Sequence, residues 1–336
     1  MQALILKAYG KTGALVLAEV ARPVVAPGEI LVQVHAAGLN PVDNAIVRGE
    51  FKPLLKFELP AVMGSDLAGV VVATGAGVTR FKVGDAVFAS VFDTGRGSLA
   101  EFVAVPEHAA AHKPANLDFV QAAAIPMVGL TAWQSFHEHA SVKPGQKVFI
   151  PAGSGGIGSF AIQLAKQMGA RVATTTSTGN VALVRSLGAD EVIDYKQQDF
   201  TQVLGDYDVV LGTVKGDGLA QALGIVRPGS KVVSLIGPPT ADFARQRGMN
   251  VVFRFVMGLL SRKIRSMARQ RGAAYSFMFV RPDGAQLAAI GKLLETGAIR
   301  PVIDQVYPFA QAKEALAYLD QGRARGKVVV RMAPAP

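Results

Sequence analysis

The sequence predicts an α/β protein, in which a β-rich domain precedes a doubly wound parallel sheet. Short β-branched runs bounded by Gly, Pro and Asp fill the first third of the chain, at residues 14–20, 29–38, 67–77 and 85–90. Runs of this length and spacing are typical of an all-β domain. From residue 147 onward, apolar strand patterns alternate with helical patterns. This alternation predicts a parallel sheet with helices on both faces.

The period of the apolar residues places the individual elements. Residues 118–140 have a helical pattern. The alternating region predicts strands at 147–151, 171–176, 191–194, 207–212 and 230–237, and helices at 156–168, 180–187 and 217–226. The last part of the chain predicts strands at 277–280, 302–309 and 326–332, and helices at 284–297 and 311–322.

A glycine-rich turn is the most specific motif of the chain. The apolar strand that ends at Ile150 leads into Gly153-Ser154-Gly155-Gly156-Ile157-Gly158, and a helical pattern follows at once. In this strand–turn–helix context the spacing predicts a dinucleotide site. Gly153 allows the tight turn, Gly155 lets a pyrophosphate approach the backbone, and Gly158 lets the helix pack on the strand. The pyrophosphate is then expected at the positive end of the helix.

The tip of the next strand bears on which dinucleotide binds. An NAD site usually has Asp or Glu there, which holds the ribose 2′-hydroxyl. Here residues 174–180 read TTTSTGN, and the next acids are Asp190 and Glu191. Hydroxyl and amide groups can donate to a 2′-phosphate, which a carboxylate would repel. The sequence therefore favours NADPH. No Arg or Lys stands at the tip itself, and Arg185 is either a phosphate ligand or a solvated surface charge.

Length and composition limit the class of protein. A chain of 336 residues, of which 50% are hydrophobic, is long enough for two domains with large cores. Zero cysteines exclude disulfides, thiolate catalysis and thiolate zinc sites. No apolar run approaches the ~20 residues of a membrane span. The first residues, MQALILKAYG, lack the layout of a signal peptide. We therefore expect a soluble, cytoplasmic protein.

The net charge of +10 is unevenly distributed, and residues 241–275 are strongly basic. Asp242 is their one acid, and apolar residues such as Phe253, Phe255 and Met257 lie among the cations. The pattern predicts one or two basic amphipathic helices. We favour a solvated helix face in a subdomain that covers a pocket. The alternatives are a surface for a membrane, a nucleic acid or an acidic ligand. The cations are Arg245, Arg247, Arg254, Arg262, Lys263, Arg265, Arg269 and Arg271.

Several longer segments resemble the medium-chain dehydrogenase/reductase family. Beside the glycine turn they are AAGLNPVDNAIVRG (36–49), LPAVMGSDLAGVVVATGAGVTRFKVGDAVFA (59–89), GSLAEFVAVP (97–106), AAIPMVGLTAW (123–133), LGADEVIDY (187–195), IRPVIDQVYPF (299–309) and GRARGKVVV (322–330). The resemblance covers essentially the whole chain. It is strongest to the zinc-free branch of quinone oxidoreductases and NADPH-dependent alkenal and enone oxidoreductases.

This resemblance implies a GroES-like β-domain formed by residues 1–124 and 283–336, and an inserted Rossmann domain of residues 125–282. It also implies an active site in the cleft between the two domains. The resemblance also implies that this protein forms a homodimer. Within the Rossmann domain, the basic segment 241–275 is expected near the cleft.

The resemblance also argues against a metal. Zinc members have Cys at the position of Asn40, Gly-His-Glu at the positions of Gly64-Ser65-Asp66, and a four-cysteine lobe without a counterpart here. Only Asp66 keeps a carboxylate, so no metal is expected, and Asp66 is expected to be a buried hydrogen-bonded or loop-anchoring group. His137-Glu138-His139 is not expected to bind metal either, because residues i and i+2 of a helix point to different sides.

Site residues are implied position by position. Asn40 is expected to face the nicotinamide ribose and the substrate, with Asp43 supporting its loop and Thr131 near the nicotinamide. The turn Ser154-Gly155-Gly156-Ile157 is expected to hold the pyrophosphate. The remaining implied contacts are Thr176, Ser177, Asn180 and Tyr195 at the 2′-phosphate and adenine end, Leu235, Ile236 and Phe279 beside the nicotinamide, and Arg323 or Lys327 at the phosphate.

Two departures from the family leave the oxyanion donor open. Many relatives have Tyr where Ser65 stands, and enone reductases often have Lys where Ala45 stands. The candidate donors are Asn40, Lys52, Ser65 and a ribose hydroxyl of the cofactor, and water is a possible proton source.

The favoured function is NADPH-dependent, metal-free hydride transfer to an α,β-unsaturated carbonyl or a quinone, a small apolar electrophile. The alternatives are a non-enzymatic NADPH-responsive binding protein that uses residues 241–271, and a zinc-independent alcohol dehydrogenase or enoyl reductase.

Overall fold

The computed structural model describes residues 1–10, 14–52, 54–55, 58–214 and 216–332. The chain divides into two compact units: unit 1 comprises residues 1–130 and 281–336, and unit 2 comprises residues 131–280. These limits differ by a few residues from the predicted ones after 124 and 282. Helix α3 (Pro126–Trp133) crosses the first of them.

Unit 1 is built on a seven-stranded sheet with the order β15-β16-β3-β5-β6-β8, in which β7 also pairs with β3. Strand β16 from the end of the chain runs antiparallel to β3, whereas β15 and β16 are parallel. Strands β15 and β16, from the last part of the chain, therefore belong to the same sheet as the strands from its first third. Its members are β3 (Glu29–Leu39), β5 (Asp66–Thr74), β6 (Ala86–Ser90), β7 (Phe102–Pro106), β8 (Ala110–His112), β15 (Ile303–Pro308) and β16 (Lys327–Arg331).

A second, three-stranded sheet of unit 1 has the order β2-β1-β4. Alternate residues of β1, β3 and β5, such as Ile5, Val32 and Leu67, enter one buried apolar cluster, which joins the two sheets. The remaining elements are β1 (Gln2–Leu6), β2 (Leu15–Glu19), β4 (Ala61–Val62), α1 (Pro41–Arg48), η2 (Glu107–Ala109), α2 (Phe119–Ala123), α11 (Gly284–Glu295), η5 (Phe309–Gln311) and α12 (Ala312–Asp320).

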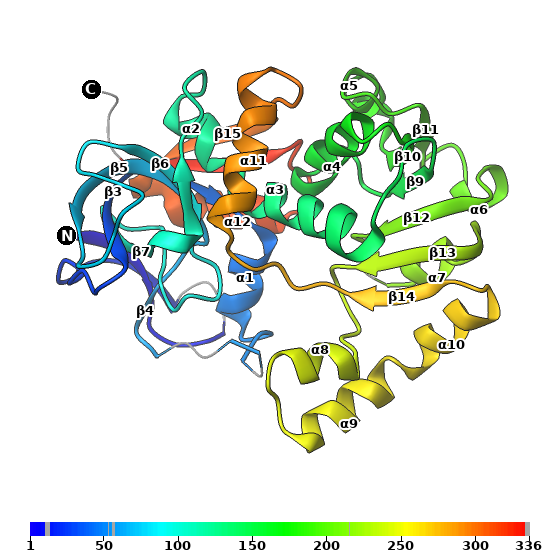
Figure 1. Cartoon of the computed structure of the whole chain (residues 1–336), viewed down its shortest axis with the longest axis horizontal. Helices are drawn as coiled ribbons and strands as arrows, with labels where there is room; N and C mark the ends of the chain where they lie inside the picture. Colours follow the sequence, from blue (N-terminus) through cyan, green and yellow to red (C-terminus); the bar gives the residue numbers. More distant parts are fainter. Residues whose placement is uncertain (11–13, 53, 56–57, 215, 333–336) are drawn as a thin grey trace. The chain divides into compact units, whose positions relative to one another are not determined.

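Unit 2 contains a six-stranded parallel sheet with the order β11-β10-β9-β12-β13-β14 (Figure 1). The chain leaves β9 in one direction toward β10 and β11, and then returns past β9 to β12, β13 and β14. Right-handed crossovers in opposite directions put helices on both faces of the sheet. The strands are β9 (Lys147–Ile150), β10 (Arg171–Thr176), β11 (Glu191–Asp194), β12 (Tyr207–Gly212), β13 (Val226–Ser234) and β14 (Ala274–Phe277).

Two helices of unit 2 pack on the same face of this sheet. Leu219 of α7 and Ile264 of α10 share a buried cluster with Phe149 and Val232 of the sheet. The helical elements of unit 2 after α3 are η3 (Gln134–Ala140), α4 (Gly156–Gln167), η4 (Thr178–Asn180), α5 (Val181–Ser186), α6 (Phe200–Val203), α7 (Gly218–Ala222), α8 (Ala241–Gln246), α9 (Val251–Leu260) and α10 (Arg262–Gln270). The predicted α/β class is confirmed.

The structure corrects three details of the prediction. The last strand of the parallel sheet is residues 274–277, whereas residues 277–280 were expected, because its pairing with residues 231–234 of β13 ends at Phe277. The basic segment forms three helices, α8 to α10, and not one or two. The helical region 118–140 is divided into α2, α3 and the π-helical η3. Within the described residues, no helix is long and apolar enough to cross a membrane.

Candidate functional site

Three of the predicted site residues of unit 1, Asn40, Ser65 and Lys327, gather where β3 ends and α1 begins. Asn40 is the N-cap of α1, and Pro41 follows as the first helical residue, a position that needs no backbone N–H donor. Asp43, in the first turn, accepts a 2.7 Å hydrogen bond from the Asn40 backbone N–H through Oδ2. Its Oδ1 accepts a 2.6 Å bond from the Ser65 hydroxyl. Asp43 therefore supports the Asn40 loop, as the sequence suggested, and also fixes Ser65.

A lysine from the other end of the chain completes this cluster. Val328 pairs with Leu39 across β16 and β3, which brings Lys327 to the level of Asn40. The Lys327 ammonium donates to the Leu39 carbonyl at 2.7 Å and to Asn40 Oδ1 at 2.5 Å. It lies 3.5 Å from Asp66 Oδ2, which also accepts a 3.0 Å bond from Asn40 Nδ2. Hydrogen bonds at both Oδ1 and Nδ2 therefore fix the orientation of the Asn40 side-chain amide.

Burial dominates the electrostatics of this cluster. Asn40, Asp43, Ser65, Asp66 and Lys327 are each at most 4% exposed. Desolvation raises the pKa of Asp43 to about 6, although the bonds from Ser65 and Asn40 oppose the shift. Desolvation likewise raises the pKa of Asp66, opposed by Lys327, and lowers the pKa of Lys327, opposed by Asp66. Lys327 is the internal cation that balances Asp66.

These contacts limit which side chains can stabilise an oxyanion. The single hydroxyl proton of Ser65 is donated to Asp43. The two amide hydrogens of Asn40 point to Asp66 Oδ2 at 3.0 Å and to the Gly38 carbonyl at 3.5 Å. Both oxygens of Asp66 already accept hydrogen bonds, Oδ1 from the Met127 backbone N–H. Such a donor set does not suit a zinc ion, which needs free N, S or carboxylate ligands.

Two other predicted residues of unit 1 lie outside this cluster. Lys52 is exposed, and its ammonium lies 4.3 Å from the centroid of the Tyr9 ring. Arg323 is exposed in the loop between α12 and β16. Lys327 was expected to approach a phosphate, and its placement differs from that expectation because its ammonium is buried against Asn40 and Asp66.

The glycine turn of unit 2 has three glycines with different surroundings. A Cβ on Gly153 would lie 2.1 Å from Thr174 Oγ1, and one on Gly158 would lie 2.5 Å from the Ala152 carbonyl oxygen. Close packing therefore requires glycine at both positions. At Gly155 the nearest atom would be 3.4 Å away, and its φ of −78° suits any residue. Neither the backbone nor the neighbouring protein atoms require glycine at position 155.

Three consecutive threonines of β10 hold this turn. Thr174 donates to the Ile150 carbonyl at 2.6 Å. Thr175 Oγ1 accepts from the Ala152 N–H at 3.1 Å, and its carbonyl accepts from the Gly153 N–H at 3.0 Å. Thr176 Oγ1 donates to Ser154 Oγ at 3.0 Å. The family resemblance implied a ligand contact for Thr176, and no sequence pattern indicated that Thr174 and Thr175 fix the turn.

The predicted residues at the tip of β10 form a neutral polar group, which we call the tip cluster: Ser154, Thr176, Ser177 and Asn180. The Asn180 Nδ2 donates to Ser154 Oγ and to Ser177 Oγ, both at 3.2 Å. Asn180 Oδ1 is buried and has no hydrogen-bond partner among the described residues. A buried acceptor without a hydrogen bond lowers the stability of the folded protein. A polar group of a ligand could satisfy the unpaired atom of the Asn180 amide. This holds whichever of the two amide positions is oxygen and whichever is nitrogen.

The other predicted residues of unit 2 lie at the start of α4, after β11, after β13 and in α3. Gly156 and Ile157 open α4, so their N–H groups belong to the first turn, which has no intrahelical acceptors. Tyr195 follows β11 and is 60% exposed. Thr131 is buried in α3, and Leu235 is half-buried after β13.

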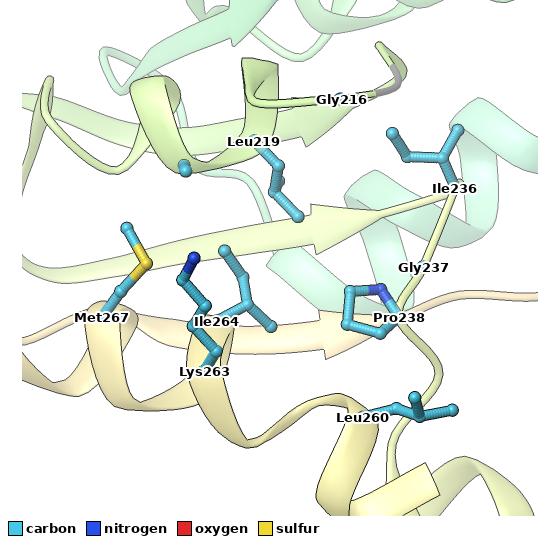
Figure 2. A pocket seen from close by; sticks show the side chains of 10 residues that line it. Gly216, Leu219, Ile236, Gly237, Pro238, Leu260, Lys263, Ile264 and Met267 are labelled. Atoms are coloured by element: carbon cyan, nitrogen blue, oxygen red, sulfur yellow. The ribbon is translucent and has the colours of Figure 1, made fainter.

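Ile236 lies at the edge of a cavity of about 470 Å³ between α7, the loop after β13, and α9 and α10 (Figure 2). The Phe279 ring lies 5.7 Å from that of Phe243 and 5.1 Å from the Arg247 guanidinium. His137 stacks on Trp133 at 4.1 Å, and burial lowers its pKa. No group of three or more His, Cys, Asp or Glu in the described part of the chain could hold a metal ion.

Comparison with known proteins places this architecture in a family. Residues 26–115 match the Alcohol dehydrogenase GroES-like domain, and residues 187–330 match the Zinc-binding dehydrogenase domain. The chain is 35% identical to the NAD(P)H oxidoreductase RTN4IP1, mitochondrial, of Danio rerio, with 98% of this chain and 91% of the relative covered. This chain belongs to the medium-chain dehydrogenase/reductase family of oxidoreductases.

Two further relatives place it in the quinone and alkenal/enone oxidoreductase branch. The chain is 35% identical to the chloroplastic NADPH-dependent alkenal/one oxidoreductase of Arabidopsis thaliana, covering 99% of this chain and 80% of the relative. The crystal structure of the quinone oxidoreductase from Coxiella burnetii superposes with a TM-score of 0.85 at 29% identity, and 99% of each chain is covered. The predicted family and its GroES-like and Rossmann domains are confirmed.

Proposed function

We propose that this oxidoreductase uses NADPH to reduce the C=C bond of an α,β-unsaturated carbonyl, or a quinone. One observation carries the cofactor part of the proposal: Gly155 sits where neither conformation nor packing requires glycine, beside the tip cluster with its unpaired Asn180 Oδ1. A bound pyrophosphate and ribose phosphate would account for both features.

The residues of the glycine turn fit a dinucleotide. The N–H groups of Gly156 and Ile157 at the start of α4 would hold the pyrophosphate, since the helix N-terminus favours negative charge. The tip cluster contains hydroxyls and an amide and no carboxylate. These groups can donate to a 2′-phosphate, so they favour NADPH over NADH. Tyr195 and Arg185, both exposed, are the proposed flanking contacts.

When bound, the nicotinamide supplies a hydride to the electron-poor carbon. The chain orients Asn40, the proposed contact of the nicotinamide ribose, through Lys327 and Asp66. Ser65 is a weak candidate for the oxyanion donor because its proton is committed to Asp43. Both amide hydrogens of Asn40 are also engaged, and Lys52 lies exposed beside Tyr9. A ribose hydroxyl of the bound cofactor would then be left to stabilise the oxyanion, with water as the proton source.

The first experiment is titration of the protein with NADPH and NADH, followed by the fluorescence of Trp133, the only tryptophan. An Asn180→Asp variant is titrated alongside, because a carboxylate would repel a 2′-phosphate. We expect tight NADPH binding, weak NADH binding, and a loss of NADPH binding of about tenfold or more in the variant, equivalent to ~1.4 kcal/mol. Equal or tighter NADH binding would refute the NADPH assignment.

A substrate panel tests the reaction. Enones, enals and quinones are assayed with NADPH, and a primary alcohol with NADP⁺ and an enoyl thioester serve as the discriminating substrates. We expect turnover of the electrophilic C=C or quinone class. Turnover of the alcohol or the thioester alone would identify the alternative enzyme classes. Cofactor binding without turnover of any substrate would support a non-enzymatic NADPH-responsive protein.

The cytoplasmic location and the homodimer remain predictions. The Danio rerio and Arabidopsis thaliana relatives carry mitochondrial and chloroplastic names, respectively. Sedimentation equilibrium of the whole chain tests the homodimer.

A further inference from the structure

Helices α8 to α10 of unit 2 combine strong positive charge with exposed apolar side chains. Residues 241–271 contain seven arginines and one lysine against a single acid, Asp242, which pairs with Arg245. In Figure 1 these helices descend from the sheet below β14, with α9 at the outer end.

The outward face of α9 is apolar, the reverse of an ordinary surface helix. Met257 is the buried residue of this helix. Val251, Phe255 and Leu259 follow one another at four-residue spacing on the opposite side, and they are 75%, 66% and 52% exposed. Val252, 64% exposed, widens the same stripe. Large apolar side chains gathered in this way on a surface indicate an interaction site.

Cations border this stripe. Arg254 lies on α9 itself, and Arg262 and Lys263 open α10 directly after Ser261. All three are exposed, and Arg265 is half-buried one residue beyond Ile264. In the part of the chain that the structure describes, no carboxylate lies within ion-pair distance of Arg262, Lys263 or Arg265. Their charge is therefore available to an anionic partner.

Three kinds of partner differ in how well they fit this combination. A second copy in a symmetric dimer would bring this cationic face against itself, which opposes association. A nucleic acid would satisfy the cations but would leave a broad aliphatic stripe of Val and Leu without a partner. An anionic phospholipid surface satisfies both, because its headgroups attract arginine and lysine while the acyl boundary accepts apolar side chains.

We propose that α9 and the start of α10 dock unit 2 on an anionic phospholipid membrane. The ten residues of α9 are about 15 Å long, too short to span a bilayer, so the helix lies in the plane of the interface. Val251, Phe255 and Leu259 enter the boundary between headgroups and acyl chains. Arg254, Arg262 and Arg265 contact lipid phosphates.

The cavity beside this surface guides the choice of variants. Leu260, Lys263, Ile264 and Met267 line it from the α9–α10 side, facing Leu219 of α7 (Figure 2). Changes at Leu260 or Lys263 would alter the cavity and the surface together. The test therefore uses Phe255 and Leu259 for the apolar stripe, and Arg262 and Arg265 for the charge.

The experiment is flotation of the full chain with vesicles of phosphatidylcholine alone or of an equimolar mixture with phosphatidylglycerol. We expect binding to the mixed vesicles that weakens as salt rises. The variant F255S/L259S should bind about tenfold more weakly or worse. R262Q/R265Q should lose about fivefold per charge removed. The matched controls V203S and R171Q/K196Q change exposed residues elsewhere in unit 2 and should bind like the parent.

A tryptophan at position 255 gives an independent readout. In F255W the difference spectrum against the parent should shift to the blue on addition of mixed vesicles, because the indole enters the interface. Unchanged circular dichroism and an unchanged thermal unfolding midpoint establish that each variant is folded.

Four results overturn the proposal. The first is no binding of the parent to mixed vesicles at low salt. The second is unchanged vesicle binding of F255S/L259S, because binding would then depend on the cations alone and not on the apolar stripe. The third is a parent dimer that F255S/L259S dissociates in sedimentation equilibrium, which would assign the stripe to a second copy. The fourth is an F255W spectrum that vesicles do not change.

Discussion

Two hydrogen-bonded clusters differ in their electrostatic setting. One, which we call the Lys327 cluster, comprises Asn40, Asp43, Ser65, Asp66 and Lys327 of unit 1, and the other is the tip cluster of unit 2. The first contains two carboxyl groups and an ammonium, all at most 4% exposed, with their hydrogen bonds made inside the chain. The second is neutral and half-buried at Ser154, Ser177 and Asn180, and it leaves an acceptor of Asn180 unpaired. A closed charged cluster fixes geometry, whereas an open neutral one is suited to bind a ligand.

The largest effect is expected from removal of the internal cation. Lys327→Met leaves Asp66 buried with no opposing charge, although Asn40 and the Met127 N–H still donate to it. Breaking a buried pair on one side costs about 3–5 kcal/mol. Urea denaturation at neutral pH measures the loss. The double variant K327M/D66N should recover a large part of it, because no uncompensated charge remains. A single variant within ~1 kcal/mol of the parent would show that Lys327 does not balance Asp66.

The second prediction concerns pH. Burial raises the pKa of Asp43 from 3.8 to about 6, so between these values the folded state binds more protons than the unfolded state. The free energy of unfolding therefore falls as pH rises, and the contribution of this group is present below about pH 4 and lost above about pH 6. Its size is about 3 kcal/mol.

The measurement compares parent and Asp43→Asn by urea denaturation between pH 4 and pH 7. The difference between their stability curves isolates this carboxyl from Asp66, whose pKa burial also raises. The parent should lose more stability than the variant as pH rises. Parallel curves would mean that Asp43 titrates alike in the folded and unfolded states.

The two clusters also differ in how much of them the sequence could predict. The tip cluster comes from a turn and a strand tip that are 22 to 26 residues apart, and the βαβ pattern brings such segments together. Lys327 and Asn40 are 287 residues apart, and their contact depends on the register of β16 on β3. No local pattern encodes that register, so the sequence did not predict this contact, and the family resemblance implied Arg323 or Lys327 at the phosphate.

The basic segment shows a similar limit. Its composition predicted amphipathic helices, and their charge was evident from the sequence. Which side of α9 faces inward depends on the burial of Met257, and this places Phe255 in solvent. Periodicity alone would have predicted that the broader apolar stripe of α9 is buried. The periodicity of a sequence does not say which partner a helix packs against.

The third prediction separates packing from ligand contact within the glycine turn. Gly158→Ala places a Cβ 2.5 Å from the Ala152 carbonyl oxygen, and such overpacking costs about 1–3 kcal/mol despite the better helix propensity of alanine. Gly155→Ala meets no atom closer than 3.4 Å and loses only the preference for glycine over alanine at the N-cap of α4, so its stability should fall by no more than ~1 kcal/mol. Its NADPH affinity should nevertheless fall about tenfold or more, because the Cβ occupies the proposed approach of the pyrophosphate.

Thermal unfolding and fluorescence titration measure the two quantities for each glycine variant. The contrast fails if Gly155→Ala binds NADPH as tightly as the parent. It also fails if both variants lose stability to the same degree, since position 155 would then be fixed by packing.

The smallest effect is expected at Ser65. Its hydroxyl proton is donated to Asp43 at 2.6 Å, so Ser65→Ala removes one hydrogen bond to a buried carboxyl and should cost about 1–2 kcal/mol. The same loss should raise the pKa of Asp43 further, because the Ser65 bond lowers it. The turnover number should change by less than about threefold, whereas removal of an oxyanion donor lowers kcat by about 10²–10³. Steady-state kinetics on the best enone or quinone, with Ser65→Thr as the hydroxyl-retaining control, decides between these outcomes. A loss of a hundredfold in kcat that Ser65→Thr restores would show that the hydroxyl leaves Asp43 during turnover, and would move Ser65 from the closed cluster into the reaction itself.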